Sequence, residues 1–258
     1  MSTFNDYTPR EIAAFRERLQ EALKECAQLQ EAAQVCARAL YEEFTESVVL
    51  ARLFVTLPFA DLPARDRAFV SALADAKGIA PLLDEKTQVL SLLGTNGAQP
   101  PWRERYESQA HLGIPLVTAE FVESIPMVAR LMHDMGVGAG RADEGGTDVL
   151  VKNLGRAAGV FYVRDAKTWL DARNRKIVSA QDFVAANDIR TVFGLGGSYL
   201  NGSFVAMILF TREIIEQSQA EAFMLLVNTF KTVTLSLVMD GALFPRAESA
   251  TRPAPRTT

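Results

Sequence analysis

The sequence is poor in the residues on which metal sites and thiol chemistry depend. Its 258 residues include two cysteines and two histidines. Cys26 and Cys36 fall within one predicted helix, where two cysteines at this separation cannot bridge, and they match no zinc spacing. We therefore expect neither a disulfide framework nor a zinc site. Free thiols suit a reducing compartment, which predicts a cytoplasmic protein.

Long apolar runs and basic stripes are also missing. No stretch reaches the roughly 18 consecutive apolar residues that a membrane helix needs. The N-terminal residues carry charge where a signal peptide would have its apolar region. The net charge is −4, whereas nucleic-acid-binding proteins usually present a basic face. We therefore expect neither a membrane nor a nucleic acid as a partner.

An amphipathic, coiled-coil-like helix is predicted over residues 9–46, after a flexible N-terminus at residues 1–8. Apolar residues recur there at alternating steps of three and four, and Thr8, Pro9 and Glu11 form an N-terminal capping box. Two interpretations stay open: the helix lies on its own domain, or it pairs with a second subunit. In a dimer, the cysteines would lie near their symmetry mates and could crosslink on oxidation.

Residues 47–240 read as one α+β domain. Three helices are predicted between and after its strands. The first ends at Gly78, the second follows Thr118, and the last covers residues 216–239. The second helix carries Ile125, Val128, Leu131 and Met132 on one face. The final helix is apolar on more than one side, so it must be covered on more than one side. Residues 136–149 are predicted to form a surface loop, and residues 241–258 a disordered tail. The predicted strands are "SVVLARLFVTLP", "TQVLSLLGTNG", "GIPLV", "AAGVFYV", "RTVFGLGG" and "GSFVAMILFTRE".

The glycine-rich run "VFGLGGSYLNGS" does not match a phosphate-binding loop. A dinucleotide fingerprint needs a third glycine where Tyr199 stands, and a helix rather than a strand after it. Asn201 and Gly202 instead predict a hairpin turn, with positive φ suited to both residues. Gly194, Gly196 and Gly197 then mark a strand that a ligand or a packed helix approaches closely.

Several motifs resemble those of GAF-like sensory domains, of the type found ahead of bacterial histidine kinases. They are "VVLARLFVTLPFADLP", "LLGTNGAQPPWRERYESQAHLGIPLVTAEFVESIPMVARLMHDMGV", "SAQDFVAANDIRTVFGLGG" and "FGLGGSYLNGSFVAMILFTREIIEQSQAEAFMLL", in the order of the family and over about residues 41–238. The resemblance implies a central antiparallel sheet with helices on its faces, a pocket beside the sheet, and terminal helices that commonly pair in a dimer. No output domain is expected after Met239, and "KTWLDARNRKIVSAQ" is longer than in a close relative.

The candidate ligand-binding residues are one arginine, one histidine, three aromatic residues and two glycines. Arg52 interrupts an apolar strand; a buried guanidinium there would need an acidic partner or an anionic ligand, and an exposed one would need neither. His111 is either a hydrogen-bonded structural histidine or a contact to a ligand or haem iron. The aromatic residues either line a pocket or belong to the core, as do Trp102, Phe121 and Trp169. The full set is Arg52, Phe54, His111, Phe161, Tyr162, Gly196 and Gly197.

These features predict a module that binds a small molecule and passes on a conformational change through dimer helices or a separate signalling protein. The sequence does not identify the ligand or a cofactor. A ligand-free scaffold is the alternative. A thiol-dependent enzyme on this fold is less well supported, because both cysteines lie outside the sheet domain, and no G-x-S-x-G motif indicates a hydrolase.

Overall fold

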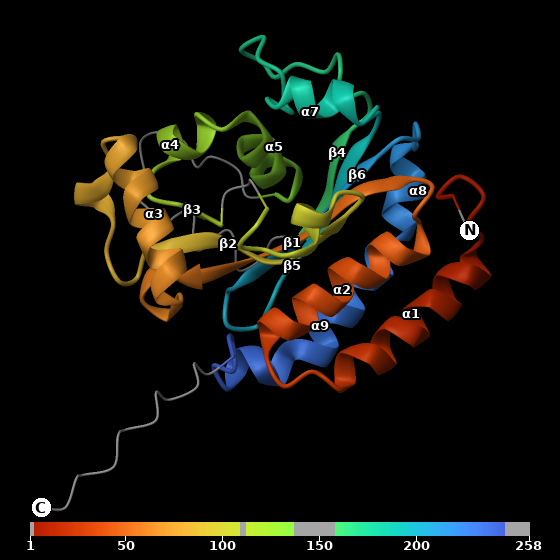
Figure 1. Ribbon diagram of the computed structural model, residues 1–258, viewed down its shortest axis with the longest axis horizontal. Coiled ribbons are helices and arrows are strands. Elements are labelled where there is room, and N and C mark those ends of the chain that lie inside the picture. The colour runs from red at the N-terminus through yellow and green to blue at the C-terminus, as the bar shows by residue number, and fades with distance from the viewer. Residues whose placement is uncertain (1–2, 109–111, 137–157, 246–258) are drawn as a thin grey trace, which may run out of the picture.

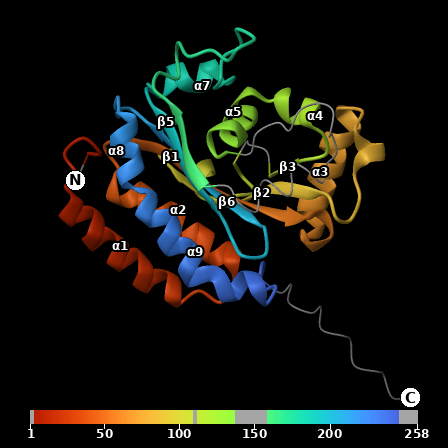
Figure 2. The same cartoon turned by 180° about the vertical axis from the view of Figure 1, so that it is seen from behind.

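Six antiparallel strands form one sheet at the centre of the molecule. The computed structural model describes residues 3–108, 112–136 and 158–245. Helices lie on both faces of the sheet (Figures 1 and 2), which confirms the predicted α+β class. In the spatial order β3-β2-β1-β6-β5-β4, the strands are Gly113–Pro115, Gln88–Gly97, Val48–Pro58, Phe204–Thr211, Val192–Ser198 and Ala158–Val163.

Three helices cover one face, and we call them the helical layer: α1 (Pro9–Lys24), α2 (Leu29–Glu43) and α9 (Met224–Met239). In Figure 1, α2 and α9 lie along the sheet and α1 lies outside them. Ala51, Leu53 and Val55 of β1 point into the core beneath this layer. Since strand side chains alternate, Leu50 and Phe54 belong to a second core on the other face.

The predicted single helix over residues 9–46 is wrong, because the chain reverses between α1 and α2 (Figure 1). Gln28 has an extended backbone, with φ −135° and ψ 153°. The first amides of α2, at Leu29 and Gln30, donate to the carbonyls of Ala242 and Leu243. The helix start is thus satisfied by a segment distant in sequence, which apolar periodicity does not register.

The chain ahead of α1 is anchored rather than flexible over its described residues. Phe4 is only 1% exposed and stacks on Phe44, with ring centroids 4.0 Å apart. Tyr7 is also buried, and its hydroxyl donates to Glu43 at 2.5 Å. Aromatic burial therefore overrides the polar character of this segment. The predicted capping box is present, because Thr8 and Glu11 bond reciprocally.

α2 approaches β2 most closely at Gly94. A Cβ atom at this position would overlap the carbonyl oxygen of Ala33. Beside it, the Gln34 amide donates to the carbonyl of Thr95 at 2.9 Å and accepts from its N–H at 3.2 Å. A glycine is required here because of the neighbouring helix, not because of its own backbone angles.

Shorter helices lie on and around the other face, and two of them replace the single helix predicted after Thr118. α4 begins at Thr118, whose hydroxyl accepts from the Phe121 N–H as an N-cap. Pro126 opens α5, and Ile125 before it is extended, as the residue before a proline tends to be. The helices of this side are α4 (Ala119–Glu123), α5 (Pro126–Asp134) and α7 (Gln181–Ala186). α3 (Ala64–Ala76) lies at the β3 edge, where Val70 packs with Val89 in the core beneath the helical layer. 3-10 turns are at Phe59–Asp61, Ala80–Leu82 and Pro100–Arg103.

The predicted hairpin joins β5 and β6, but its turn differs from the predicted type. Tyr199 N–H donates to the Ser203 carbonyl at 2.7 Å, and Gly202 N–H to the Tyr199 carbonyl at 3.1 Å. Of the two predicted turn residues, only Gly202 has a positive φ, of 87°. This is a three-residue loop with a left-handed last residue, rather than a two-residue turn.

The C-terminal helix is also divided. α8 (Gln217–Ala222) and α9 are joined at Phe223, which is buried. By length and composition alone, Gln217–Met239 could span a membrane, although 33% of its most apolar window is buried in the fold. Residues 241–245, predicted as the start of a disordered tail, are instead ordered, because Leu243 and Phe244 pack against the core under the helical layer. Residues 246–258 and most of the predicted loop at residues 136–149 lie outside the described residues.

Candidate functional site

The sheet places one charged side chain, that of Arg52, within a largely apolar surface. We call the side of the sheet opposite the helical layer the α5 face. Arg52 on β1 lies between Thr95 on β2 and Ile208 on β6. The same row continues through Gly194 on β5 to Phe161 on β4. A guanidinium therefore lies near the middle of a row that is otherwise apolar or weakly polar.

The structure divides the predicted site residues between the two faces. Four of them lie on the α5 face: Arg52, Phe54, Phe161 and Gly196. Tyr162 points the other way, where its hydroxyl donates to the Ile215 carbonyl at 2.6 Å. Gly197 faces Lys231 of α9. Neighbours in a strand alternate in direction, so the pairs 161–162 and 196–197 cannot line one pocket.

His111 lies outside the described residues, so its predicted role as a ligand contact stays a prediction. The other histidine, His133, is exposed in the last turn of α5. No cluster of three metal-ligating side chains occurs within the part of the chain that the structure describes.

Core side chains and a helix approach the strand glycines. A Cβ atom on Gly196 would lie 2.6 Å from Cζ of Phe204 and 2.8 Å from Sδ of Met135, at the end of α5. On β4, a Cβ atom at Gly159 would lie 2.9 Å from the carbonyl oxygen of Asp134. These glycines therefore let α5 lie close to β4 and β5, and packed side chains fill the space above them.

Arg52 has an incomplete set of partners. Its Nη2 donates to Oγ of Ser108 at 3.0 Å, and its buried Nε has no acceptor. Burial lowers the pKa of the guanidinium to about 10. Among the described residues, no carboxylate lies within ion-pair distance of it. This positive charge is thus desolvated without a matching negative charge.

A second buried arginine, Arg105, was not anticipated from the sequence. Its Nε donates to the Leu92 carbonyl at 2.8 Å and its Nη1 to the Tyr106 hydroxyl at 2.9 Å. Its Nη2 forms an ion pair with Asp66, and the two side chains are 2% and 1% exposed. In sequence, Asp66 is an ordinary acidic residue at a helix start and Arg105 lies in irregular chain. Only the fold brings them together.

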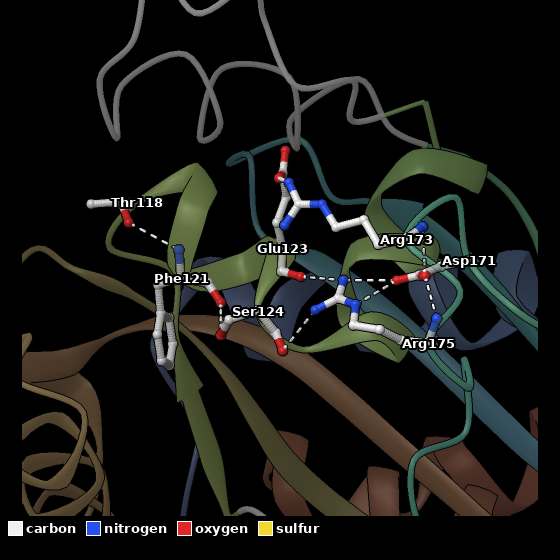
Figure 3. Close-up of polar contacts among 7 residues, drawn as sticks. All are labelled: Thr118, Phe121, Glu123, Ser124, Asp171, Arg173 and Arg175. Carbon is white, nitrogen blue, oxygen red and sulfur yellow. Dashed lines mark hydrogen bonds and ion pairs between the residues drawn. The ribbon is translucent and has the colours of Figure 1, made fainter.

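The segment after β4 is fastened to α4 by the ionic contacts drawn in Figure 3. Arg175 bonds Asp171 and donates to the Glu123 carbonyl at 2.8 Å. Arg173 forms an ion pair with the Glu123 carboxylate. The long stretch noted in the sequence, residues 167–181, thus holds the end of α4 in place. Hydrogen bonds to Asp171 from the backbone and from Arg175 also keep the pKa of its carboxyl low.

The thiols are poor candidates for chemistry. Cys36 is fully buried in the helical layer, and burial raises the pKa of its thiol far above its ordinary value. Cys26 is partly buried, and its thiol pKa is raised as well. A reactive thiol needs a lowered pKa and access, so neither cysteine has the environment of a nucleophile.

Comparison with known proteins finds distant structural similarity and no match in sequence. No family model matches the chain, and no curated protein matches it in sequence. Among similar solved structures, the phycocyanobilin-bound GAF domain from a cyanobacterial phytochrome is 8% identical, with a TM-score of 0.47 over 89% of this chain and 96% of that chain. The phycoerythrobilin-bound GAF domain from a cyanobacterial phytochrome is also 8% identical, with a TM-score of 0.48 over 89% and 97%. Bacteriophytochrome RpBphP3 from R. palustris is 7% identical, with a TM-score of 0.42 over 89% and 40%.

The sheet and helices have the arrangement that the motifs imply, with a central antiparallel sheet between layers of helices. At an identity of 8% or less, these structures transfer no ligand and no residue role to it.

Proposed function

We propose that this chain is a sensory module that binds a small molecule on the α5 face and relays binding through the helical layer. The observation that carries the proposal is Arg52, a desolvated guanidinium whose described partner is the Ser108 hydroxyl. Placing a charge in an apolar strand costs stability unless a partner compensates it. A ligand that supplies the missing acceptors would recover that cost on binding.

β1 provides a direct mechanical connection between the ligand and the helical layer. Arg52 lies on the ligand side, while the adjacent Ala51 and Leu53 point into the core beneath the helical layer, where α2 packs on β1. α2 is in turn locked to β2 at Gly94 and through Gln34. A ligand shifts the layer only as far as it binds one arrangement more tightly than another.

The surface that would transmit the change is the outer side of α1 and α9. Leu225 of α9 is 48% exposed there. Beside Leu225, a hollow of about 240 Å³ lies between the helices, lined by Arg16, Gln20, Leu225, Asn228, Thr229, Thr232 and Val233. We expect a second copy of the chain or a signalling protein in the cytoplasm to bind this surface.

A ligand-free scaffold is the second candidate. It is favoured by the side chains of Phe161, Ile208, Phe204 and Met135, which already occupy the space above Gly194 and Gly196. On this alternative, Arg52 would bind no ligand and its Nε would stay without an acceptor, and the protein would act only through contacts of its helices.

Native mass spectrometry and thermal denaturation of the purified full chain separate the two candidates. A sensory module is expected to carry a copurified small molecule, or to gain thermal stability from at least one compound in a metabolite library. Binding to the folded state raises its stability by an amount that grows with ligand concentration. A protein of bare polypeptide mass that no compound stabilises would be a scaffold.

A further inference from the structure

We propose that the ligand of the α5 face is an organic carboxylate, held by Arg52 and Ser108 with its apolar body against the sheet. This inference rests on the proposed function and adds the chemical class of the ligand.

Two hydrogen-bond donors at this position lack acceptors among the described residues. Arg52 has five N–H groups, and one is used by Oγ of Ser108. Its Nε is buried without a partner. Because the Ser108 oxygen accepts that bond, its own O–H remains available to donate. Ser108 is itself buried, at 6% exposure, so its hydroxyl has little access to water.

Among the other described arginines that are partly or fully buried, Arg67 donates to the carbonyls of Ala60 and Leu62, and the rest have carboxylates near them. Arg105 pairs with Asp66, Arg175 with Asp171 and Arg130 with Asp134. Arg190 also has a buried Nε without a partner, yet it lies close enough to Asp165 and Asp188 to help keep the pKa of both carboxyls low. Only desolvation acts on the pKa of Arg52. Among the described arginines, Arg52 thus combines a buried nitrogen without an acceptor with the lack of a nearby carboxylate.

The geometry of the donors selects a carboxylate. A guanidinium is planar and offers parallel N–H groups, which match the two oxygens of a carboxylate. The surroundings favour a ligand with an organic body, because Ile208 and Phe54 lie beside Arg52 on the α5 face. The third neighbour, Thr95, already donates its hydroxyl to the Trp102 carbonyl. A small hydrated ion would gain nothing from these apolar contacts, whereas an alkyl or aryl group would.

The test compares acids with amides of the same shape. Butyrate, benzoate and indole-3-acetate are titrated into the full chain beside butyramide, benzamide and indole-3-acetamide, at constant ionic strength. Affinity is measured by calorimetry, and stability by thermal denaturation. We expect at least one acid to bind about tenfold or more tightly than its amide, since hydrogen bonds to charged groups have this magnitude.

Variants of the chain assign the effect to the two donors. Arg52→Gln should abolish the preference for acid over amide, and Arg52→Lys should retain part of it, because lysine keeps the charge without the planar fork. Ser108→Ala should weaken acid binding several-fold. Arg190→Gln is the matched control: it removes a partly shielded arginine elsewhere and should leave binding unchanged. If Arg52→Gln does not unfold cooperatively, the acid-to-amide ratio of Arg52→Lys decides the question.

Three results of these titrations would overturn the inference. They are equal binding of acids and amides by the wild type, equal acid binding by wild type and Arg52→Gln, and stabilisation by chloride or phosphate alone, which would indicate an adventitious ion only. A copurified neutral or cationic ligand would also overturn it, while leaving the sensory function intact. Absence of any ligand would instead count against the proposed function itself.

Discussion

Two arginines beside the same part of the sheet meet very different surroundings. Arg105 is enclosed by the Leu92 carbonyl, the Tyr106 hydroxyl and the Asp66 carboxylate. Arg52 has the Ser108 hydroxyl and a buried nitrogen without an acceptor. Arg105 is buried as a whole, whereas Arg52 is partly buried with its Nε shielded from solvent. The complete set of acceptors marks Arg105 as structural, and the incomplete set marks Arg52 as a candidate contact for a ligand.

The structural task of Arg105 is evident from the sheet. β3 pairs with β2 only at residues 89–91, and the carbonyl of Leu92 lies just beyond that pairing. The Arg105 side chain supplies the hydrogen bond that a longer β3 would have made at this carbonyl. Its charge is then balanced by Asp66 at the start of α3. One side chain thus connects a sheet edge to a helix.

The largest expected effect is that of Arg105→Gln. This change leaves the Asp66 carboxylate buried without its partner and frees the Leu92 carbonyl, so the free energy of unfolding should fall by about 3–5 kcal/mol. Urea denaturation measures it. Arg103→Gln is the control, since Arg103 lies in the same segment but is exposed, and a loss below about 1 kcal/mol is expected there. Equal losses in the two variants would contradict a structural role for Arg105.

Asp66→Asn should cost less, because an asparagine oxygen can still accept from Arg105. The guanidinium keeps its bonds to Leu92 and Tyr106 but loses the opposite charge. A charge-assisted hydrogen bond contributes about 1.5–3 kcal/mol, and we expect a loss of that size in urea denaturation. The double variant Arg105→Gln, Asp66→Asn should lose clearly less stability than the sum of the two single losses, as expected for residues in contact. Full additivity would mean that the pair does not interact.

Tyr106→Phe removes one neutral acceptor from the same cluster. The ring stays in place beneath Arg105, whose guanidinium carbon lies 4.6 Å from its centroid. The expected loss is about 0.5–1.5 kcal/mol, the usual contribution of a single hydrogen bond. A loss as large as that of Asp66→Asn would show that the hydroxyl, and not the ion pair, dominates the cluster.

Arg52→Gln should change the stability of the ligand-free protein by no more than about 0.5 kcal/mol. It removes one hydrogen bond to Ser108, but it also removes a desolvated charge that the described chain does not balance. Urea denaturation of protein stripped of small molecules by dialysis provides the measurement. A fall of more than about 2 kcal/mol in the free energy of unfolding would show that Arg52, like Arg105, has a structural role. The contrast between the two arginines would then not hold.

The smallest expected effect on stability is that of Glu213, a partly buried carboxylate without a cationic partner in the described contacts. Burial raises the pKa of its carboxyl, even though the Asn5 N–H donates to it. The folded state therefore holds its proton to a higher pH than the unfolded state, and stability falls as pH rises through that interval. Glu213→Gln should flatten this fall when urea denaturation is compared at several values between pH 4.5 and 7. Parallel pH profiles of the two proteins would contradict it.

Most of the strands could be predicted from the sequence, and the helices less well. β-branched and aromatic runs ending in Pro58, Gly97 or Asn201-Gly202 define strands by local chemistry, and the structure has them. The break between α1 and α2 could not be predicted, because the apolar period continues across it. It depends on the C-terminal carbonyls of Ala242 and Leu243, far along the chain.

Individual site residues were harder to predict than the face that carries them. Arg52 could be singled out, since a charge within "LARLF" is conspicuous in any setting. Residue type alone places Tyr162 and Gly197 in one site with Phe161 and Gly196, although the alternation of side chains in a strand directs them to the other face. The Arg105–Asp66 pair had no local pattern at all.

The sequence by itself therefore determined the α+β class, the strands, the capping box at Thr8 and the unusual position of Arg52. These depend on residues close together in the chain, where propensity and periodicity act. Only the tertiary structure decided which charges are balanced, which glycines are required and how the terminal helices fold back. Each of those depends on a contact between distant segments, such as Gly94 with Ala33, Arg105 with Asp66, or Leu29 with Ala242.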